Sequence, residues 1–193
     1  MWTPAALREA ADPARFELRP TGPGAVLDVG CGSKKHAGAV GIDLSPDTDA
    51  DLVHDLNDLP WPLDDAVFDQ ILMQDVIEHL HDAYGVFAEL HRVARPGARV
   101  QLRTPHFSSV LAYSDPTHVH FFSAAAIRGL AEPGFAHYTD ARFRPLSVRL
   151  DLWLPFRLLG VETLANRRTE LYERYLAFRF PAMNIRAEFE VLK

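Results

Sequence analysis

The chain has 193 residues, which is the length of one domain. Hydrophobic side chains make up 48% and charged ones 24%, a composition that excludes disordered, collagen-like and coiled-coil proteins. Lys and Arg number 20 against 26 Asp and Glu, so the net charge of −6 disfavours binding to bulk nucleic acid. The single cysteine, Cys31, excludes an internal disulfide and favours a reducing, cytoplasmic location.

Two further features bear on the membrane. The first twenty residues carry three acids and lack the basic start and apolar core of a signal peptide. The longest uncharged stretches, 104–114 and 116–127, are shorter than the roughly 20 residues that a membrane helix needs. We therefore expect neither a secretory leader nor a transmembrane segment.

Short apolar runs in the first half indicate buried parallel strands. Residues 25–29 stop at Gly30-Cys31-Gly32, and residues 40–44 end in an acid followed by turn residues. Residues 59–63 must form a loop, because two prolines interrupt them. Further strands are predicted at 51–55, 68–74 and 98–104.

The second half combines helices with alternating strands. Asp82 can cap one helix, and Ser123 can cap a second that Pro133-Gly134 ends. Residues 148–152 and 185–191 alternate between apolar and polar side chains, which indicates antiparallel strands. The order of elements predicts an α/β fold, a doubly wound and mostly parallel sheet with antiparallel edge strands.

Ligands of such sheets bind beyond the carboxyl ends of the strands, where the topology reverses. Gly30 and Gly32 let the backbone approach a ligand closely, and Asp43, at the end of the next strand, can accept both hydroxyls of a ribose. The third glycine of the dinucleotide fingerprint is absent, and Asp28 puts a negative charge where pyrophosphate would lie. The pattern favours an adenosine ligand other than NAD.

Successive segments resemble the motifs of class I S-adenosylmethionine-dependent methyltransferases. They are VLDVGCG at 26–32, GID at 41–43, HDL at 54–56, FD through EHL at 68–80, and RVARPG at 92–97. The resemblance covers about residues 24–110. It implies a Rossmann-like, seven-stranded sheet, S-adenosylmethionine as cofactor, and methyl transfer.

The resemblance also implies which residues hold the cofactor. The backbone of residues 30–32 would hold the methionine end, and Asp43 the ribose hydroxyls. Asp55-Leu56 would hold the adenine, and Gln74-Asp75 would lie beside the sulfonium. The whole implied set is Asp28, Gly30, Cys31, Gly32, Asp43, Leu44, Asp55, Leu56, Gln74 and Asp75.

The first crossover departs from the family pattern. Only eight residues, 33–40, lead from the second glycine into the next strand, whereas a parallel crossover normally takes a dozen or more. We therefore predict that the first helix is truncated to about a turn or replaced by a loop, and that residues 3–15 cover part of the exposed side. Lys34 and Lys35 in this loop are either solvated or neutralise a carboxylate of the cofactor or of an acidic acceptor.

Histidines and acids beyond the fourth and fifth strands are the candidates for acceptor chemistry. His106 and His118 can act as general bases near neutral pH, and Asp115 can orient one of them. A capped turn with a structural His118 explains the same residues equally well. We predict no metal site, although an alternative is a metal-dependent enzyme that uses His106, Asp115, His118 and His120.

Two other segments have structural explanations. Glu78-His79 and His81 are expected to satisfy backbone groups at a helix start. The insertion at about 151–181 contains the apolar run 153–159, and we expect it to pack in the core or to form an acceptor lid or homodimer surface. A membrane-surface contact is a less favoured alternative, because acids offset the basic residues of the insertion.

Taken together, the sequence predicts one domain, 1–193, with a cofactor-binding half at 24–110 and an acceptor-side half at 111–193. The predicted function is S-adenosylmethionine-dependent methyl transfer, by in-line displacement, to a small or medium-sized acceptor molecule. The alternative from another class is a non-catalytic module that binds S-adenosylmethionine or regulates a partner.

Overall fold

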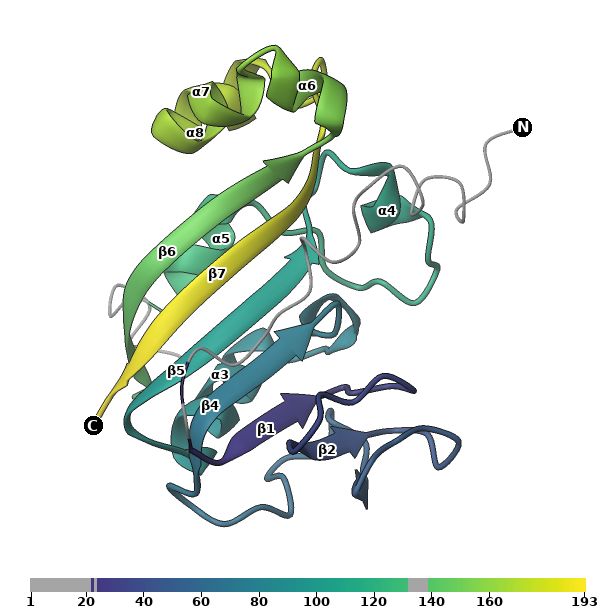
Figure 1. Ribbon diagram of the computed structural model, residues 1–193, viewed down its shortest axis with the longest axis vertical. Coiled ribbons are helices and arrows are strands. Elements are labelled where there is room, and N and C mark those ends of the chain that lie inside the picture. The colour runs from purple at the N-terminus through teal and green to yellow at the C-terminus, as the bar shows by residue number, and fades with distance from the viewer. Residues whose placement is uncertain (1–21, 23, 132–138) are drawn as a thin grey trace.

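The computed structural model describes residues 22, 24–131 and 139–193 of the chain. The expected cover at 3–15 and the expected helix end at Pro133-Gly134 lie outside these residues. The described part forms a seven-stranded sheet with the strand order β3-β2-β1-β4-β5-β7-β6 (Figure 1). Strands β1 to β5 are parallel, and β7 runs antiparallel to both β5 and β6. This is the predicted Rossmann-like architecture with antiparallel edge strands.

The strands agree with the apolar runs of the sequence, although the last three along the chain begin earlier than predicted. The strands are β1 (Val26–Val29), β2 (Val40–Asp43), β3 (Leu52–Val53), β4 (Phe68–Gln74), β5 (Ala94–Pro105), β6 (Arg142–Leu152) and β7 (Ala182–Leu192). β5 begins at Ala94, which pairs with Phe68, and a register shift before Gln70 accommodates Pro96-Gly97 inside the strand. Turn residues can therefore lie within a strand at such an irregularity.

The helices lie in two places. They are η1, a 3₁₀ turn (Ile77–His79), α3 (Ala83–Val93), α4 (Val110–Tyr113), α5 (Ala124–Ala131), α6 (Leu154–Leu158), α7 (Val161–Arg167) and α8 (Thr169–Tyr175). Helices α3 and α5 pack on one face of the sheet, whereas α6 to α8 form a layer beyond the ends of β6 and β7 (Figure 1). Both predicted caps are confirmed, because Asp82 accepts from the Gly85 N–H and Ser123 from the Ala126 N–H. No helix in the described part is long and apolar enough to cross a bilayer.

The main core lies between the sheet and helices α3 and α5. Phe87 and Leu90 of α3 are completely buried there. Phe87 packs edge-to-face against Phe143 of β6 and Phe189 of β7, with ring centroids 5.4 and 5.8 Å away. Because aromatic side chains bury large apolar areas, this cluster ties the antiparallel strands to the helical layer.

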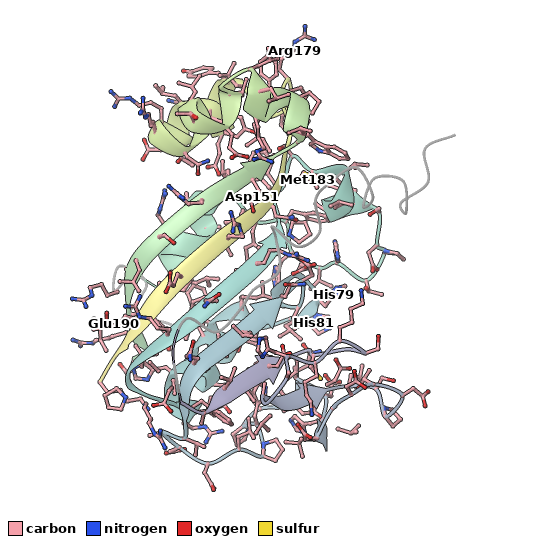
Figure 2. The ribbon with its side chains drawn as sticks, viewed as in Figure 1. His79, His81, Asp151, Arg179, Met183 and Glu190 are labelled. Atoms are coloured by element: carbon pink, nitrogen blue, oxygen red, sulfur yellow. The ribbon has the colours of Figure 1, made fainter. Side chains whose placement is uncertain are left out.

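The opposite face of the sheet, which no described helix covers, is charged. Acids and arginines pair across neighbouring strands on this face (Figure 2). The pairs are Arg99–Glu188, Arg144–Glu190 and Arg186–Asp151. In antiparallel strands with one solvated face, polar residues on that face alternate with apolar residues that face the core.

The connection from β1 to β2 contains no helix, as the short crossover predicted. The side chains of Lys35 and Cys31 lie over Gly41 of β2, where an added Cβ would be 2.5 Å from Lys35 Cδ and 2.8 Å from Cys31 Sγ. Lys35 Nζ donates to Asp51 Oδ2 at 2.7 Å, and the Gly41 N–H donates to the same oxygen. In this structure Lys35 therefore fixes the loop to the sheet and has Asp51 as its partner.

Candidate functional site

The turn after β1 brings two glycines to the carboxyl edge of the sheet. Gly30 and Gly32 have φ angles of 66° and 57°, a left-handed conformation that favours glycine. A Cβ added at Gly30 would lie 2.3 Å from Val76 Cγ2, so packing also requires a glycine there. A Cβ added at Gly32 would meet no heavy atom within 4 Å. The backbone at Gly32 therefore faces open space, which fits the close approach of a ligand.

Asp43 ends β2 directly beside this turn. Its Oδ2 accepts from the Gly32 N–H at 2.9 Å, and its Oδ1 accepts from the Ser45 N–H at 3.1 Å. A carboxylate has about four acceptor positions, so capacity remains for further hydrogen bonds. The structure thus brings together the glycine turn and the acid that the sequence analysis associated with a ribose.

Asp28 and Cys31 lie beneath the same turn. Asp28 is buried, and its Oδ2 accepts from the His36 N–H at 2.7 Å. Burial raises the pKa of Asp28, although this hydrogen bond opposes the shift. Burial also raises the pKa of the Cys31 thiol to about 11, and the charges of Asp28 and Asp43 act in the same direction. Cys31 is therefore a neutral packing residue near pH 7.

The two residues expected at the adenine, Asp55 and Leu56, and the further cofactor candidate Leu44 differ from one another in exposure. Asp55 begins a turn after β3, where its Oδ1 accepts from the Asn57 N–H at 2.9 Å. Leu44 is 63% exposed beside Asp43. The Leu56 side chain is buried in the core, and its carbonyl accepts from Trp61 Nε1 at 3.1 Å. A contact between the adenine and the Leu56 side chain does not fit this geometry, because that side chain is packed in the core.

Gln74 and Asp75 lie where β4 ends. Asp75 has a φ of 54°, and its N–H donates to the Arg103 carbonyl at 2.8 Å. Its carboxylate pairs with the Arg103 guanidinium of β5, with Nε and Oδ1 3.0 Å apart. The Asp75 charge expected beside the sulfonium is therefore already balanced by an arginine.

Glu78 is almost completely buried at this edge, with 1% exposure. Its Oε2 accepts from the Thr104 hydroxyl at 2.9 Å, whereas its Oε1 is buried and has no hydrogen-bond partner among the described residues. Burial, followed by the charge of Asp75, raises the pKa of Glu78 to about 8. Glu78 was predicted only to satisfy backbone groups at a helix start. The structure shows instead that its side chain is a buried acid at the candidate site.

His106 does not have the surroundings of a general base. It has no exposed surface. Its Nδ1 accepts from the Ser108 N–H at 3.2 Å, and its Nε2 lies 3.2 Å from Glu173 Oε1 of α8. Both ring nitrogens are engaged and shielded, an arrangement that does not favour proton transfer, and the general-base role of His106 stays a prediction. The ring links the end of β5 to the insertion.

Asp115 forms the capped turn that was the alternative explanation. Its Oδ1 accepts from the Thr117 N–H at 2.9 Å and from the Thr117 hydroxyl at 2.6 Å, and the hydroxyl bond lowers the pKa of Asp115. The Asp115 carboxylate therefore does not orient His118. The His118 ring is held through Nδ1, which lies 2.8 Å from the Ala112 carbonyl oxygen.

The alternative metal set is not brought together. His106 is buried against α8, and His120 Nε2 lies 3.2 Å from the carbonyl oxygen of His81. Within the described ranges, the group of three side chains with metal-ligand spacing is instead Glu78, His79 and His118. Sequence reasoning missed this group, although Glu78-His79 directly beyond the fourth strand was a signal for it.

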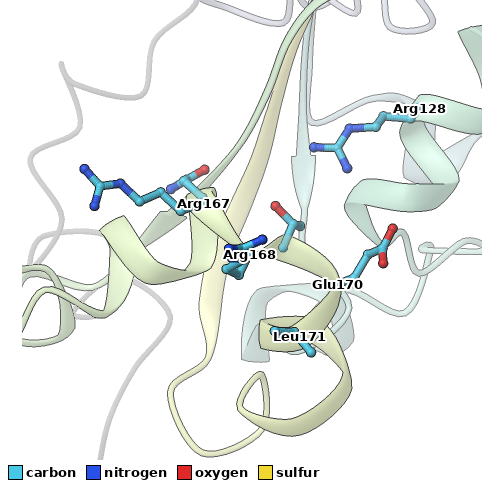
Figure 3. A pocket seen from close by; sticks show the side chains of 7 residues that line it. Arg128, Arg167, Arg168, Glu170 and Leu171 are labelled. Atoms are coloured by element: carbon cyan, nitrogen blue, oxygen red, sulfur yellow. The ribbon is translucent and has the colours of Figure 1, made fainter.

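A separate pocket of about 370 Å³ lies between α5 and the α7–α8 segment (Figure 3). It is lined by Arg128, Asn166, Arg167, Arg168, Thr169, Glu170 and Leu171. None of the residues expected to bind the cofactor lines it. We therefore place the candidate site at the glycine turn and the ends of β4 and β5.

A family comparison supports this placement. Residues 27–102 match the family model described as a methyltransferase domain, and this range contains the glycine turn, Asp43 and the end of β4. Residues 27–102 therefore carry a methyltransferase domain. This match favours a methyl-transferring enzyme over the non-catalytic alternative. No curated protein matches the chain.

Solved structures share the fold of this methyltransferase. A S-adenosylmethionine-dependent methyltransferase from Mesorhizobium loti is 17% identical, with a TM-score of 0.60 over 94% of this chain and 97% of that one. A second, from Archaeoglobus fulgidus, is 16% identical, with a TM-score of 0.56 over 88% and 86% of the chains. The [4+2]-cyclase SpnF, also 16% identical, has a TM-score of 0.56 over 89% and 76%. These similarities show the fold, which is also the fold of a protein described as a cyclase.

Proposed function

We propose that this methyltransferase acts on a small acceptor bound beyond the ends of β4 and β5, and that residues 30–32 and Asp43 hold the methyl donor. The observation that carries the proposal is the position of the Asp43 carboxylate, 2.9 Å from the Gly32 nitrogen at a turn that faces open space. Strand ends that diverge at such a point form the usual ligand crevice of a doubly wound sheet.

The residues around this crevice would each have a separate role in binding the methyl donor. When bound, S-adenosylmethionine supplies a methyl group on a positively charged sulfur. Asp43 accepts hydrogen bonds from the ribose, and the backbone of residues 30–32 approaches the methionine end. Asp55 and the exposed Leu44 lie on the adenine side. Gln74 and Asp75 mark the reacting end, where alignment of donor and acceptor supplies much of the rate.

The net charge and the apolar insertion support two finer proposals. The charge of −6 and the single buried thiol suit a small acceptor and a reducing compartment, so we propose a cytoplasmic enzyme. The layer α6 to α8 exposes several large apolar side chains, and we propose that it forms a homodimer surface.

Calorimetric titration tests the donor site. We expect S-adenosylmethionine and S-adenosylhomocysteine to bind the chain with micromolar affinity, with NAD as the negative control. Asp43→Ala should weaken binding at least tenfold, because the ribose loses its carboxylate acceptor. The matched control is Asp47→Ala, which removes an exposed acid from the same loop. Equal affinity of the two variants for S-adenosylhomocysteine would contradict the role of Asp43.

A further inference from the structure

Three metal-ligand side chains meet at the end of β4. Glu78 and His79 belong to η1, and His118 comes from the loop that follows α4. The backbone holds this loop in place, because the N–H groups of Val119 and His120 donate to the Glu78 carbonyl oxygen at 2.8 and 3.2 Å. One donor atom from each of the three side chains lies within 4.8 Å of the other two. Figure 2 shows His79 at this edge of the sheet.

The spacing inside the group leaves a gap for an ion. Glu78 Oε1 is buried without a hydrogen-bond partner among the described residues, and His118 Nε2 lies 4.0 Å from it. This distance is too long for a hydrogen bond. Two metal–ligand bonds of about 2.1 Å each span up to about 4.2 Å. A carboxylate oxygen and an imidazole nitrogen at this separation are therefore placed to share one cation.

The surrounding hydrogen bonds prepare both histidines as ligands. His118 Nδ1 faces the Ala112 carbonyl oxygen, which can only accept, so Nδ1 carries the proton. The Thr117 hydroxyl gives its one proton to Asp115, so it must accept from His79 Nδ1, 2.9 Å away. Both rings therefore keep the lone pair on Nε2. Outer partners of this kind orient the histidines of metal sites.

We propose that Glu78, His79 and His118 bind a divalent transition-metal ion. Two imidazoles and one carboxylate suit ions such as Zn²⁺ or Mn²⁺, whereas Mg²⁺ and Ca²⁺ prefer oxygen ligands. Three protein ligands leave coordination positions open, which is typical of a catalytic rather than a structural site.

The use of this ion rests on the proposed function. The group lies beyond β4, where we place the acceptor, and an open position on the ion can bind an acceptor hydroxyl and lower its pKa. The hydroxyl proton passes to bulk water. The oxygen then forms the new C–O bond while the C–S bond of the donor breaks, and the sulfur keeps that electron pair.

Metal binding is tested on the untagged chain, freed of metal by dialysis against a chelator. Calorimetry with Zn²⁺, Mn²⁺ and Mg²⁺ should give one ion per chain, with at least tenfold preference for the first two. Co²⁺ should give the visible absorption of a nitrogen- and oxygen-ligated ion. The absence of saturable binding by Zn²⁺, Mn²⁺ and Co²⁺ would overturn the proposal.

Variants show where the ion binds. Glu78→Gln keeps the shape of the side chain and its contact with Thr104, so it should fold, yet it should weaken Zn²⁺ binding by at least tenfold. His118→Ala should do the same. His81→Ala removes an exposed histidine of the same segment and is the control. If Glu78→Gln binds Zn²⁺ as the control does, the ion lies elsewhere and the proposal fails.

Two readouts separate this inference from the proposed function. Binding of S-adenosylhomocysteine reports the donor site and should be unchanged in Glu78→Gln. Zn²⁺ binding reports the metal site and should be unchanged in Asp43→Ala. A failure of the first assay in the native chain contradicts the donor site alone, and a failure of the second contradicts the metal site alone.

Discussion

At the residue scale, two glycines of one turn have different reasons to be glycine. Both have a positive φ, but only Gly30 packs against a neighbour, Val76, so closely that a Cβ would overlap it. Gly32 faces open space and is held by Asp43 through its N–H. Within this three-residue turn, Gly30 therefore contributes to stability, whereas Gly32 leaves room for a ligand.

The pair Gly30→Ala and Gly32→Ala tests this assignment. Gly32→Ala should cost about 1 to 2 kcal/mol of unfolding free energy, from the left-handed backbone alone. Gly30→Ala should cost about 1 to 3 kcal/mol more, because Val76 must move. Urea denaturation followed by circular dichroism measures both. Equal losses in the two variants would show that the Val76 contact is unimportant.

At the element scale, loops replace helices along one side of the sheet and need their own anchors. Residues 54–67 join β3 to β4 without a helix. Glu89 and Arg92 of α3 hold this loop. Glu89 Oε2 accepts from the Trp61 N–H at 2.7 Å, and Arg92 donates to the carbonyl oxygens of Trp61 and Leu63. The core helix thus fixes a segment that has no regular structure of its own.

Removing this anchor should destabilise the fold. Glu89→Ala leaves the Trp61 N–H and the Arg92 guanidinium without their buried acceptor, so we expect a loss of about 2 to 3 kcal/mol in urea denaturation. Glu190→Ala is the control, because it breaks a more exposed pair with Arg144 and should cost about 0 to 1 kcal/mol. Losses of similar size would mean that the loop does not depend on α3.

At the scale of the whole molecule, the insertion is fastened to the site by buried polar contacts. Glu173 of α8 accepts from the Ala124 N–H at 2.7 Å, at the start of α5, and contacts His106 at the end of β5. Tyr172 beside it is completely buried. The outer surface of the same layer exposes Leu158 and Leu159 by 79% and 73%. One side of the insertion is therefore core, and the other is an unpaired apolar surface.

The homodimer proposal concerns this outer surface. We expect light scattering after size exclusion to give the mass of a dimer for the native chain. The double variant Leu158→Ser, Leu159→Ser should give a folded monomer, because both side chains are exposed. Leu192→Ser, at the far end of β7, is the control. A monomeric native chain at high protein concentration would contradict the proposal.

The sequence by itself determined the features that depend on neighbouring residues. The apolar runs, the capping residues Asp82 and Ser123, and the eight-residue crossover fixed the strands, the helix starts and the missing first helix. The glycine turn and Asp43 were also visible, because strand ends in a parallel sheet meet at one edge. Such signals act over a few residues, so the chain displays them directly.

Tertiary structure alone decided the chemistry at the acceptor end. His106 and His118 have the same ordinary chemistry in the sequence, yet packing against α8 shields His106, and the loop after α4 brings His118 to Glu78. Glu78 Oε1 is buried without a hydrogen-bond partner among the described residues, and Glu78 contacts both β5 and this loop. Burial and long-range contact set the role of a titratable side chain, and neither is encoded in its local spacing.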